Sequence, residues 1–392
     1  MQYKKGLRGY IAGQTSICEL NEKTKRITYR GRDIETLAGK VPFEEVAYLL
    51  LGSRHASWFE LNEFKIRVCT SFCSFGLGKW EKVAETLAAL PPEAHSMELL
   101  RHIINAFAMY DDRRKPQDEA HDREIAIDLV GLMIYFVALV QRHKEGLSPL
   151  LIIPSDKGSL AANIFYLLGK KPSPLEVEVM DVLFTLYAEH EFNGSTFGGV
   201  RMAATLDTDI YSGMINGVGN LKGLRHGGAN EATWGLIQSF ADVVDVEDYL
   251  LKKIGETLEQ KAGWKMPGFG HAVYKTGDAR VPIIKDYIYR LSREKKNMIY
   301  FDICCKIEQA MLKAHRLYPL KKYPSFRWWF PNIDFWAAPV YYLMGIPHYL
   351  NTPLFAASRI AGWAAHWIEC KYELKEKLIR PRAKYIGPKP QT

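Results

Sequence analysis

Apolar residues recur at helical spacing along most of this chain, and this pattern limits the possible folds more than any other feature of the sequence. Clear examples are PFEEVAYLLLG, PLEVEVMDVLFTLYAEH and FAASRIAGWAAHWIECKYELKEKL. Between Thr15 and Arg30, two short β-like runs flank NEKT and predict a small hairpin. The sequence therefore predicts an all-α protein with a short N-terminal β-hairpin, and 392 residues are enough for two domains.

The longest apolar run, LVGLMIYFVALV at 129–140, is shorter than the roughly 20 residues of a membrane span. We therefore expect a buried core helix there and no membrane partner. The first residues, MQYKKGLRGYIAGQ, have no apolar stretch after their lysines, so they do not resemble a secretory signal. The six cysteines are scattered without a CxxC pattern, which is typical of reduced thiols. These features predict a cytoplasmic protein.

A net charge of +8 is compatible with nucleic acid or with small anionic ligands. The basic residues are dispersed and mostly mixed with acidic ones, so we expect no nucleic-acid binding. Anionic metabolites are the better explanation for scattered arginines.

Four segments place a titratable residue beside glycine or proline, where functional groups are often held by a rigid scaffold. They are AEHEFNGSTF, GLRHGGAN, MPGFGHAVYKTGDAR and FPNIDFW. The chain has no HExxH motif, so we expect no catalytic metal, and it has no GxSxG elbow or P-loop. Histidines with an aspartate favour proton abstraction next to a carbonyl, and arginines favour binding of carboxylates.

These segments occur in the order typical of the citrate synthase family, together with GLRGYIAGQTSICEL and ITYRGRDI near the start and KLIRPRAKYIGP near the end. The chain closely resembles this family, which includes 2-methylcitrate synthases. The resemblance implies a large helical domain at 1–228 and 338–392 and a small helical domain at 229–337. It also implies an acyltransferase without a cofactor, which condenses oxaloacetate with an acyl-CoA and then hydrolyses the thioester.

The resemblance implies three catalytic residues. His226 resembles the histidine that hydrogen-bonds the thioester carbonyl oxygen, and Asp334 resembles the base that removes the methyl proton. His271 resembles the histidine that hydrogen-bonds the oxaloacetate ketone. A thioester methyl is a very weak acid, so base and oxyanion donor must act together.

The resemblance also implies how oxaloacetate is held. His190, Arg280 and Arg359 match family positions that bind it. Arg380, in LIRP, matches the arginine that family members contribute to the partner subunit's site. A homodimer is therefore the smallest expected assembly, and a higher homo-oligomer is compatible with it.

Other positions are expected to meet coenzyme A. Lys275 matches a position that contacts its phosphates, and the backbone from Met266 to Gly268 matches the part that reads adenine. The two glycines after His226 are expected to let the thioester and a hinge come close to the histidine.

The chain departs from the usual family sequence GPLHGG at Leu224 and Arg225. A cation at Arg225 would disfavour a protonated His226, and a neutral imidazole still donates a hydrogen bond. The alanine usual after HE.N in the family is replaced by Gly194, and the usual DPR is DAR at 278–280. None of these changes removes a reacting group, although a catalytically inactive family member acting as a scaffold or regulator stays an alternative.

The preferred acyl group is left open by the sequence, because one methyl group is worth only about 1–3 kcal/mol in a pocket. FWAAPVYYLMGIP resembles 2-methylcitrate synthases in part, through Ala337, Ala338 and Met344. We expect a citrate synthase that uses acetyl-CoA, with a 2-methylcitrate synthase that uses propionyl-CoA as the alternative.

Overall fold

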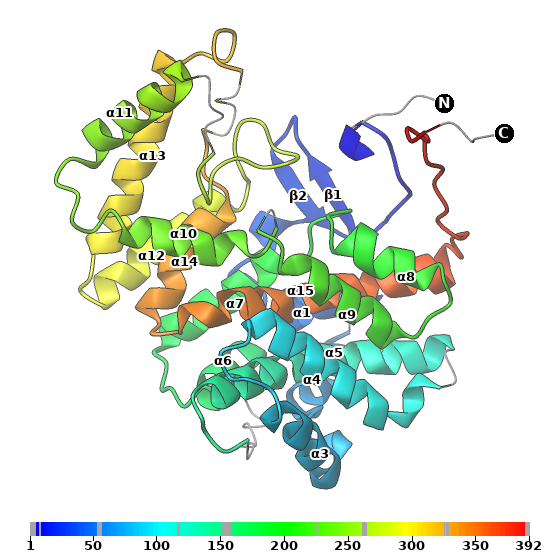
Figure 1. Ribbon diagram of the computed structural model, residues 1–392. Coiled ribbons are helices and arrows are strands. Elements are labelled where there is room, and N and C mark those ends of the chain that lie inside the picture. The colour runs from blue at the N-terminus through cyan, green and yellow to red at the C-terminus, as the bar shows by residue number, and fades with distance from the viewer. Residues whose placement is uncertain are drawn as a thin grey trace.

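The computed structural model is mainly helical, which confirms the predicted fold class (Figure 1). The structure describes residues 5–7, 9–52, 57–115, 118–149, 158–224, 226–260, 265–324, 326 and 329–388.

The predicted N-terminal hairpin is confirmed and is extended by a third strand. Strands β1 (Cys18–Asn21), β2 (Arg26–Tyr29) and β3 (Arg32–Asp33) form an antiparallel sheet in this order. Cys18 lies opposite Tyr29 in the register of β1 and β2, and both side chains are buried. One face of the small sheet therefore packs on the helical core.

The larger group of helices surrounds two central ones, α5 (Glu119–Lys144) and α15 (Asn351–Ile368), which pack against each other. Every residue of α15 is buried, so this helix runs through the core and can present polar side chains only inside the protein. The helices around this pair are α1 (Phe43–Gly52), α2 (Trp58–Thr70), α3 (Leu77–Ala88), α4 (Ser96–Tyr110), α6 (Leu160–Leu167), α7 (Pro174–Tyr187), α8 (Met202–Ala204) and α9 (Ile210–Leu221).

A second group of helices packs mainly on itself and lies at the upper left of Figure 1. It consists of α10 (Ala229–Gln238), α11 (Val246–Glu259), α12 (Val281–Glu294), α13 (Ile299–Leu317) and α14 (Ile333–Leu343). This group covers the predicted small domain at 229–337. The predicted boundary at 337/338 falls within α14, and the division into two domains stays a prediction.

Helix α5 contains the longest apolar run and is long and apolar enough to cross a membrane. Its most apolar window is 89% buried inside the protein, however. The other helices therefore cover these side chains, as in a core helix, which is what the sequence predicts.

Local capping signals explain where several helices begin. At α7, Ser173 accepts a hydrogen bond from the Glu176 backbone N–H (3.2 Å), and Glu176 accepts one from the Ser173 N–H (2.7 Å). This capping box and Pro174 at the first turn fix the predicted start.

The C-terminal helix differs from its prediction, which covered 355–378. It begins earlier, at Asn351, and ends in a π-helical turn at Glu369–Glu373. The LKEKL stretch that follows, at 374–378, is exposed. It has little packed apolar surface, and helix propensity alone rarely stabilises a short helix.

The glycine-rich stretch GVGNLKGLRHGG at 217–228 predicts a break between helices, which is partly wrong, since α9 continues to Leu221. A Cβ on Gly217 would lie 3.0 Å from the Trp363 ring, and one on Gly213 would lie 2.7 Å from the Trp367 ring. These glycines allow α9 to pack closely on α15 rather than forming a hinge.

Candidate functional site

Two of the predicted histidines lie together beside the sheet. The rings of His190 and His271 are 4.9 Å apart between centroids, and the Tyr274 ring stacks on His271 at 4.5 Å. The Tyr274 hydroxyl lies 2.9 Å from Nε2 of His190. Burial, followed by the positive charge of Arg280, lowers the pKa of His190 well below its ordinary value. His190 is therefore a neutral side chain at physiological pH.

The hydrogen bonds of His271 fix its tautomer. Its Nδ1 faces the backbone N–H groups of Val273 (3.1 Å) and Tyr274 (3.4 Å), which can only donate. Burial lowers the pKa of His271 to about 4. In the neutral ring the proton is consequently on Nε2, which is left as a hydrogen-bond donor.

His226 lies in the turn between α9 and α10, and its Nε2 is 3.0 Å from Oδ1 of Asn193. That oxygen also accepts from the backbone N–H groups of Ser195 and Thr196, so Nε2 of His226 is the donor. Burial, followed by the charge of Arg359, lowers the pKa of His226 to about 3. The predicted cause of a neutral His226, Arg225, lies outside the described residues.

The two glycines after His226 have a packing role within the chain. A Cβ on Gly227 would lie 2.7 Å from Cγ of Leu221, and one on Gly228 would lie 2.6 Å from the carbonyl oxygen of Lys222. The end of α9 therefore occupies this space, and the glycines let the chain turn back against that helix.

Asp334 lies in the first turn of α14, which Asn332 caps by accepting from the Asp334 N–H (3.0 Å). Its Oδ1 accepts hydrogen bonds from the Tyr187 hydroxyl (2.8 Å) and from Nδ2 of Asn230 (3.3 Å). Burial raises the pKa of Asp334, and these two hydrogen bonds oppose the rise. The result is a carboxylate that takes up a proton more readily than an ordinary aspartate.

Arg280 is buried and already has a carboxylate partner. Its Nε and Nη2 donate to the two oxygens of Asp278 at 2.9 and 2.7 Å. Burial lowers the pKa of Arg280, but the negative charge and hydrogen bonds of Asp278 raise it by more, so the pKa of Arg280 lies above its usual value. Asp278 also accepts from the Ile333 N–H (3.2 Å), so the pair is joined to the start of α14.

Arg359 is 1% exposed and lies over the Phe355 ring, 4.7 Å from its centroid. Its Nε donates to the carbonyl oxygen of Tyr187, and its Nη1 has no hydrogen-bond partner among the described residues. A buried guanidinium with a free donor is suited to binding a carboxylate.

His190, His226, His271, Arg280, Asp334 and Arg359 influence one another electrostatically, and we call this group the substrate cluster. The remaining predicted residues lie outside it. Arg380 is exposed, and its Nη1 donates to the carbonyl oxygen of Pro381 (3.1 Å). The Lys275 side chain is 78% exposed and its Nζ pairs with Glu22 at 2.9 Å. Met266 is buried, and Gly268 has a φ of 75° with Phe335 so close that a Cβ would lie 2.9 Å away. The positive φ and the close contact with Phe335 therefore explain why position 268 needs glycine.

Several neighbours of the reactive groups were not predicted. Asn193, Asn230, Tyr274 and Asp278 lie in the segments that the sequence singles out, whereas Tyr187 lies just before one of them. Tyr187 and Asn230 come from α7 and α10 and meet at Asp334. No periodicity or motif indicates such a contact between distant helices.

Two further features bear on what the site can hold. Within the described ranges, no group of three or more histidine, cysteine, aspartate and glutamate side chains is arranged to hold a metal. A cavity of about 920 Å³ lies between the sheet, α12 and α13, and Asp278 borders it, but His190, His226 and His271 do not. The candidate functional site is therefore the substrate cluster and not this cavity.

Comparison with known proteins identifies the class. The family model described as citrate synthase, C-terminal domain, matches residues 6–382. A structure of citrate synthase from Thermoplasma acidophilum, in a ternary complex with carboxymethyl coenzyme A and oxaloacetate, superposes with a TM-score of 0.85 at 28% identity, covering 100% of this chain and 98% of that one. The chain belongs to the citrate synthase family.

Two relatives narrow the type of enzyme. Citrate synthase 2 of Bacillus subtilis is 35% identical, over 100% of this chain and 98% of its own length. The 2-methylcitrate synthase of Shewanella oneidensis is 34% identical, over 98% and 95%. The protein is thus an acyltransferase of the citrate or 2-methylcitrate synthase type.

Proposed function

We propose that this protein is a citrate synthase, which condenses oxaloacetate with acetyl-CoA and hydrolyses the thioester to citrate and coenzyme A. The observation that carries the proposal is the cluster itself. It combines a partly buried carboxylate of raised pKa, Asp334, with neutral histidines and two buried arginines.

The free donors of the substrate cluster support binding of oxaloacetate. Nη1 of Arg359 has no partner among the described residues, and the Asp278 contacts leave Nη1 of Arg280 for a ligand. The Nε2–H of His271 is the donor for the ketone oxygen, and His190 lies beside it. Each charge-assisted hydrogen bond contributes roughly 1.5–3 kcal/mol.

Carbon–carbon bond formation starts with proton removal. Asp334 takes a proton from the thioester methyl while His226 donates a hydrogen bond to the thioester oxygen, on which the negative charge develops. In this structure the Nε2–H of His226 donates to Oδ1 of Asn193. The thioester oxygen must therefore displace Asn193 Oδ1 or share the same donor with it. The resulting enol carbon attacks the ketone carbon, and His271 stabilises the alkoxide. Water then hydrolyses the thioester.

The coenzyme A and dimer assignments belong to the same proposal. Lys275 would bind a phosphate in competition with Glu22, and the 266–268 backbone would face adenine. Arg380 would complete a neighbour's site in a homodimer or larger homo-oligomer. The exposed apolar side chains around it support a covering second chain, since Leu378, Tyr385 and Ile386 are 55%, 74% and 90% exposed. A cytoplasmic location agrees with six free cysteines.

A 2-methylcitrate synthase is the second candidate. Relatives of both kinds match at 35% and 34% identity, so overall similarity favours neither strongly. An extra methyl on the acyl group changes binding by only about 1–3 kcal/mol, so a few side chains decide the preference.

The test is thiol release from acetyl-CoA and propionyl-CoA, each with oxaloacetate, by the wild type and by Asp334→Asn. We expect faster release from acetyl-CoA, and release abolished in the variant. Asp128→Asn serves as a control, since this buried carboxylate pairs with Arg67 and Arg113 away from the cluster. Faster release from propionyl-CoA would assign the second candidate, and no release from either by the folded protein would favour an inactive family member.

A further inference from the structure

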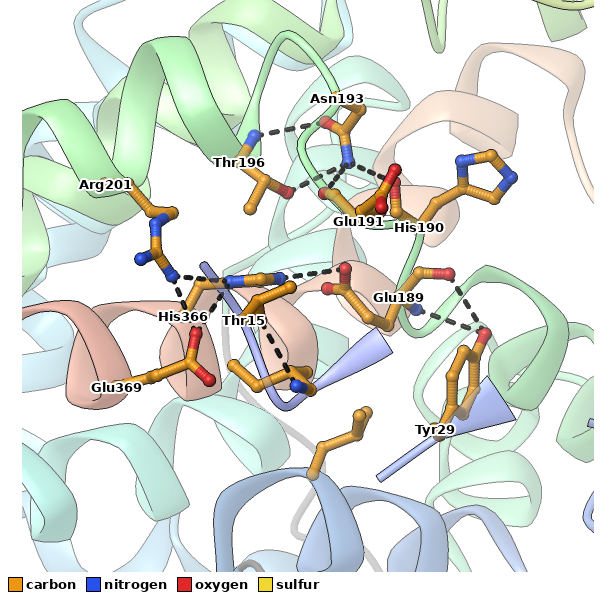
Figure 2. Close-up of polar contacts among 12 residues, drawn as sticks. Thr15, Tyr29, Glu189, His190, Glu191, Asn193, Thr196, Arg201, His366 and Glu369 are labelled. Carbon is orange, nitrogen blue, oxygen red and sulfur yellow. Dashed lines mark hydrogen bonds and ion pairs between the residues drawn. The ribbon is translucent and has the colours of Figure 1, made fainter. Parts of the chain in front are cut away.

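A buried line of polar side chains lies beside the substrate cluster, and the proposed chemistry does not use it (Figure 2). Nη1 of Arg201 contacts Oε2 of Glu369 (2.8 Å) and Nδ1 of His366 (3.2 Å). Nε2 of His366 contacts Oε1 of Glu189 (3.0 Å). The side chains of Arg201, His366, Glu369 and Glu189 are at most 2% exposed. Burying polar groups costs free energy unless they are hydrogen-bonded or paired, so their burial requires an explanation.

The partners of His366 determine which groups donate and which accept along this line of hydrogen bonds. Arg201 can only donate, so Nδ1 of His366 accepts and its proton is on Nε2. That Nε2–H donates to Glu189. Through this hydrogen bond His366 holds one oxygen of the Glu189 side chain in place.

The charges along the line do not cancel within it. Arg201 is paired directly with Glu369, whose Oε1 also accepts from the N–H (2.6 Å) and hydroxyl (2.9 Å) of Ser16. Apart from His366, Glu189 has no basic side chain within 4.0 Å among the described residues, and its Oε2 has no hydrogen-bond partner there. One fully buried carboxylate is thus left without a direct counter-ion.

Arg359 is a cation that lies near Glu189. A Cβ on Gly362 would lie 2.1 Å from Oε2 of Glu189, and Gly362 is one turn from Arg359 on the same face of α15. Arg359 also donates to the carbonyl oxygen of Tyr187, two residues before Glu189. Among neighbouring charges, Glu189 does most to offset the lowering of the Arg359 pKa by burial.

The positive charges of Arg280 and Arg359, which are proposed to bind oxaloacetate, are therefore balanced by carboxylates in different ways. Asp278 contacts Arg280 directly and occupies its Nε and Nη2. Glu189 stays more than 4.0 Å from Arg359 and leaves Nη1 free. Three contacts hold Glu189 there: His366 on its carboxylate, Gly362 against Oε2, and the Tyr29 hydroxyl on its backbone.

We propose that Glu189 is the fixed counter-charge of Arg359 and sets the affinity of the site for oxaloacetate, and that His366 is the positioning residue that prevents Glu189 from occupying the arginine. This inference rests on the proposed function, because it takes the ligand of Arg359 to be an oxaloacetate carboxylate. When His366 holds Glu189 in place, the negative charge of Glu189 lowers the attraction of the substrate cluster for the oxaloacetate dianion, so bound oxaloacetate can leave. If Glu189 were released, its carboxylate would compete with oxaloacetate for Arg359 directly.

The two substitutions that follow have opposite expected effects. Glu189→Gln keeps an acceptor for His366 and removes the charge, so the dissociation constant for oxaloacetate is expected to fall about tenfold. His366→Leu removes the hold on Glu189, which then pairs with Arg359, so the constant is expected to rise about tenfold. His366→Gln retains one acceptor and one donor and should stay near the wild type.

The experiment is calorimetric titration of the full-length protein and these variants with oxaloacetate, after thermal unfolding has shown that each is folded. Asp128→Asn is the matched control for loss of a buried carboxylate, with no change in affinity expected. Tighter binding by Glu189→Gln supports the proposal even when His366→Leu fails to fold. Weaker or unchanged binding by Glu189→Gln overturns it and leaves the proposed function intact. A wild type that does not bind oxaloacetate overturns both.

Discussion

The Tyr187 hydroxyl donates a 2.8 Å hydrogen bond to Oδ1 of Asp334, and Tyr187 also accepts a hydrogen bond from Arg359 through its backbone carbonyl. One residue at the end of α7 thus contacts both the proposed base and a proposed substrate-binding arginine. The position of the base and the position of the arginine are consequently set by the same segment.

Replacing Tyr187 by phenylalanine is expected to shift the pH dependence of turnover. Burial raises the pKa of Asp334, and the Tyr187 hydrogen bond opposes this rise, so its loss raises the pKa further. The base acts in its deprotonated form, and activity should therefore fall at a higher pH on the acid side, with kcat/KM lowered about tenfold near neutrality. Tyr211→Phe, which removes a buried hydrogen bond to Asp111, is the control, and an acid limb at the same pH in Tyr187→Phe and wild type would contradict the prediction.

Replacing Arg359 by glutamine should weaken capture of oxaloacetate. The loss of a charge-assisted hydrogen bond of roughly 1.5–3 kcal/mol raises KM for oxaloacetate by about 10- to 150-fold. KM for the acyl-CoA should change little, because the free Nη1 is assigned to the oxaloacetate carboxylate. Steady-state kinetics with each substrate varied in turn checks this, and equal increases in both constants would argue for a general disturbance of the site.

The protein should lose stability in mild acid. Burial lowers the pKa of His226 to about 3 and of His271 to about 4, whereas both titrate near 6.5 in the unfolded chain. Between pH 6.5 and 4 the unfolded state therefore binds more protons. The free energy of unfolding is highest above pH 6.5 and falls on acidification by at most about 1.4 kcal/mol per pH unit for each histidine.

Urea unfolding at several pH values between 7.5 and 4.5 measures this slope. The double variant His226→Gln, His271→Gln should show a shallower dependence, because its two positions no longer titrate. An unchanged slope in the double variant would show that other groups cause the acid sensitivity.

The glycine after His226 should be required for folding rather than for binding. Gly227→Ala places a Cβ 2.7 Å from Leu221 and is expected to destabilise the protein by about 1–3 kcal/mol. Gly194→Ala is the matched comparison beside the same histidine, since its nearest neighbour, Cδ2 of His226, would lie 3.8 Å away. Equal free energies of unfolding for the two variants would contradict the packing explanation.

The sequence by itself determined where most of the helices lie, and it predicted the reactive groups. Helical spacing and capping residues act over a few positions, so they can be read locally, as at the start of α7 with Ser173 and Glu176. Resemblance to the family in turn pointed to His190, His226, His271 and Asp334. Where local signals conflicted with packing, prediction failed: glycines expected to form a break pack α9 against α15, and the exposed end of the last helix does not form.

Only the tertiary structure decided which groups act on these residues. Tyr187 and Asp334 are 147 positions apart, and Glu189 and His366 are 177 apart, so no local pattern connects them. Their contacts depend on how α7, α14 and α15 pack, and the same packing excludes water. That exclusion keeps the histidines neutral, raises the pKa of Asp334 and makes the charge of Glu189 matter to Arg359, because burial penalises charge and strengthens the interactions between charges that remain.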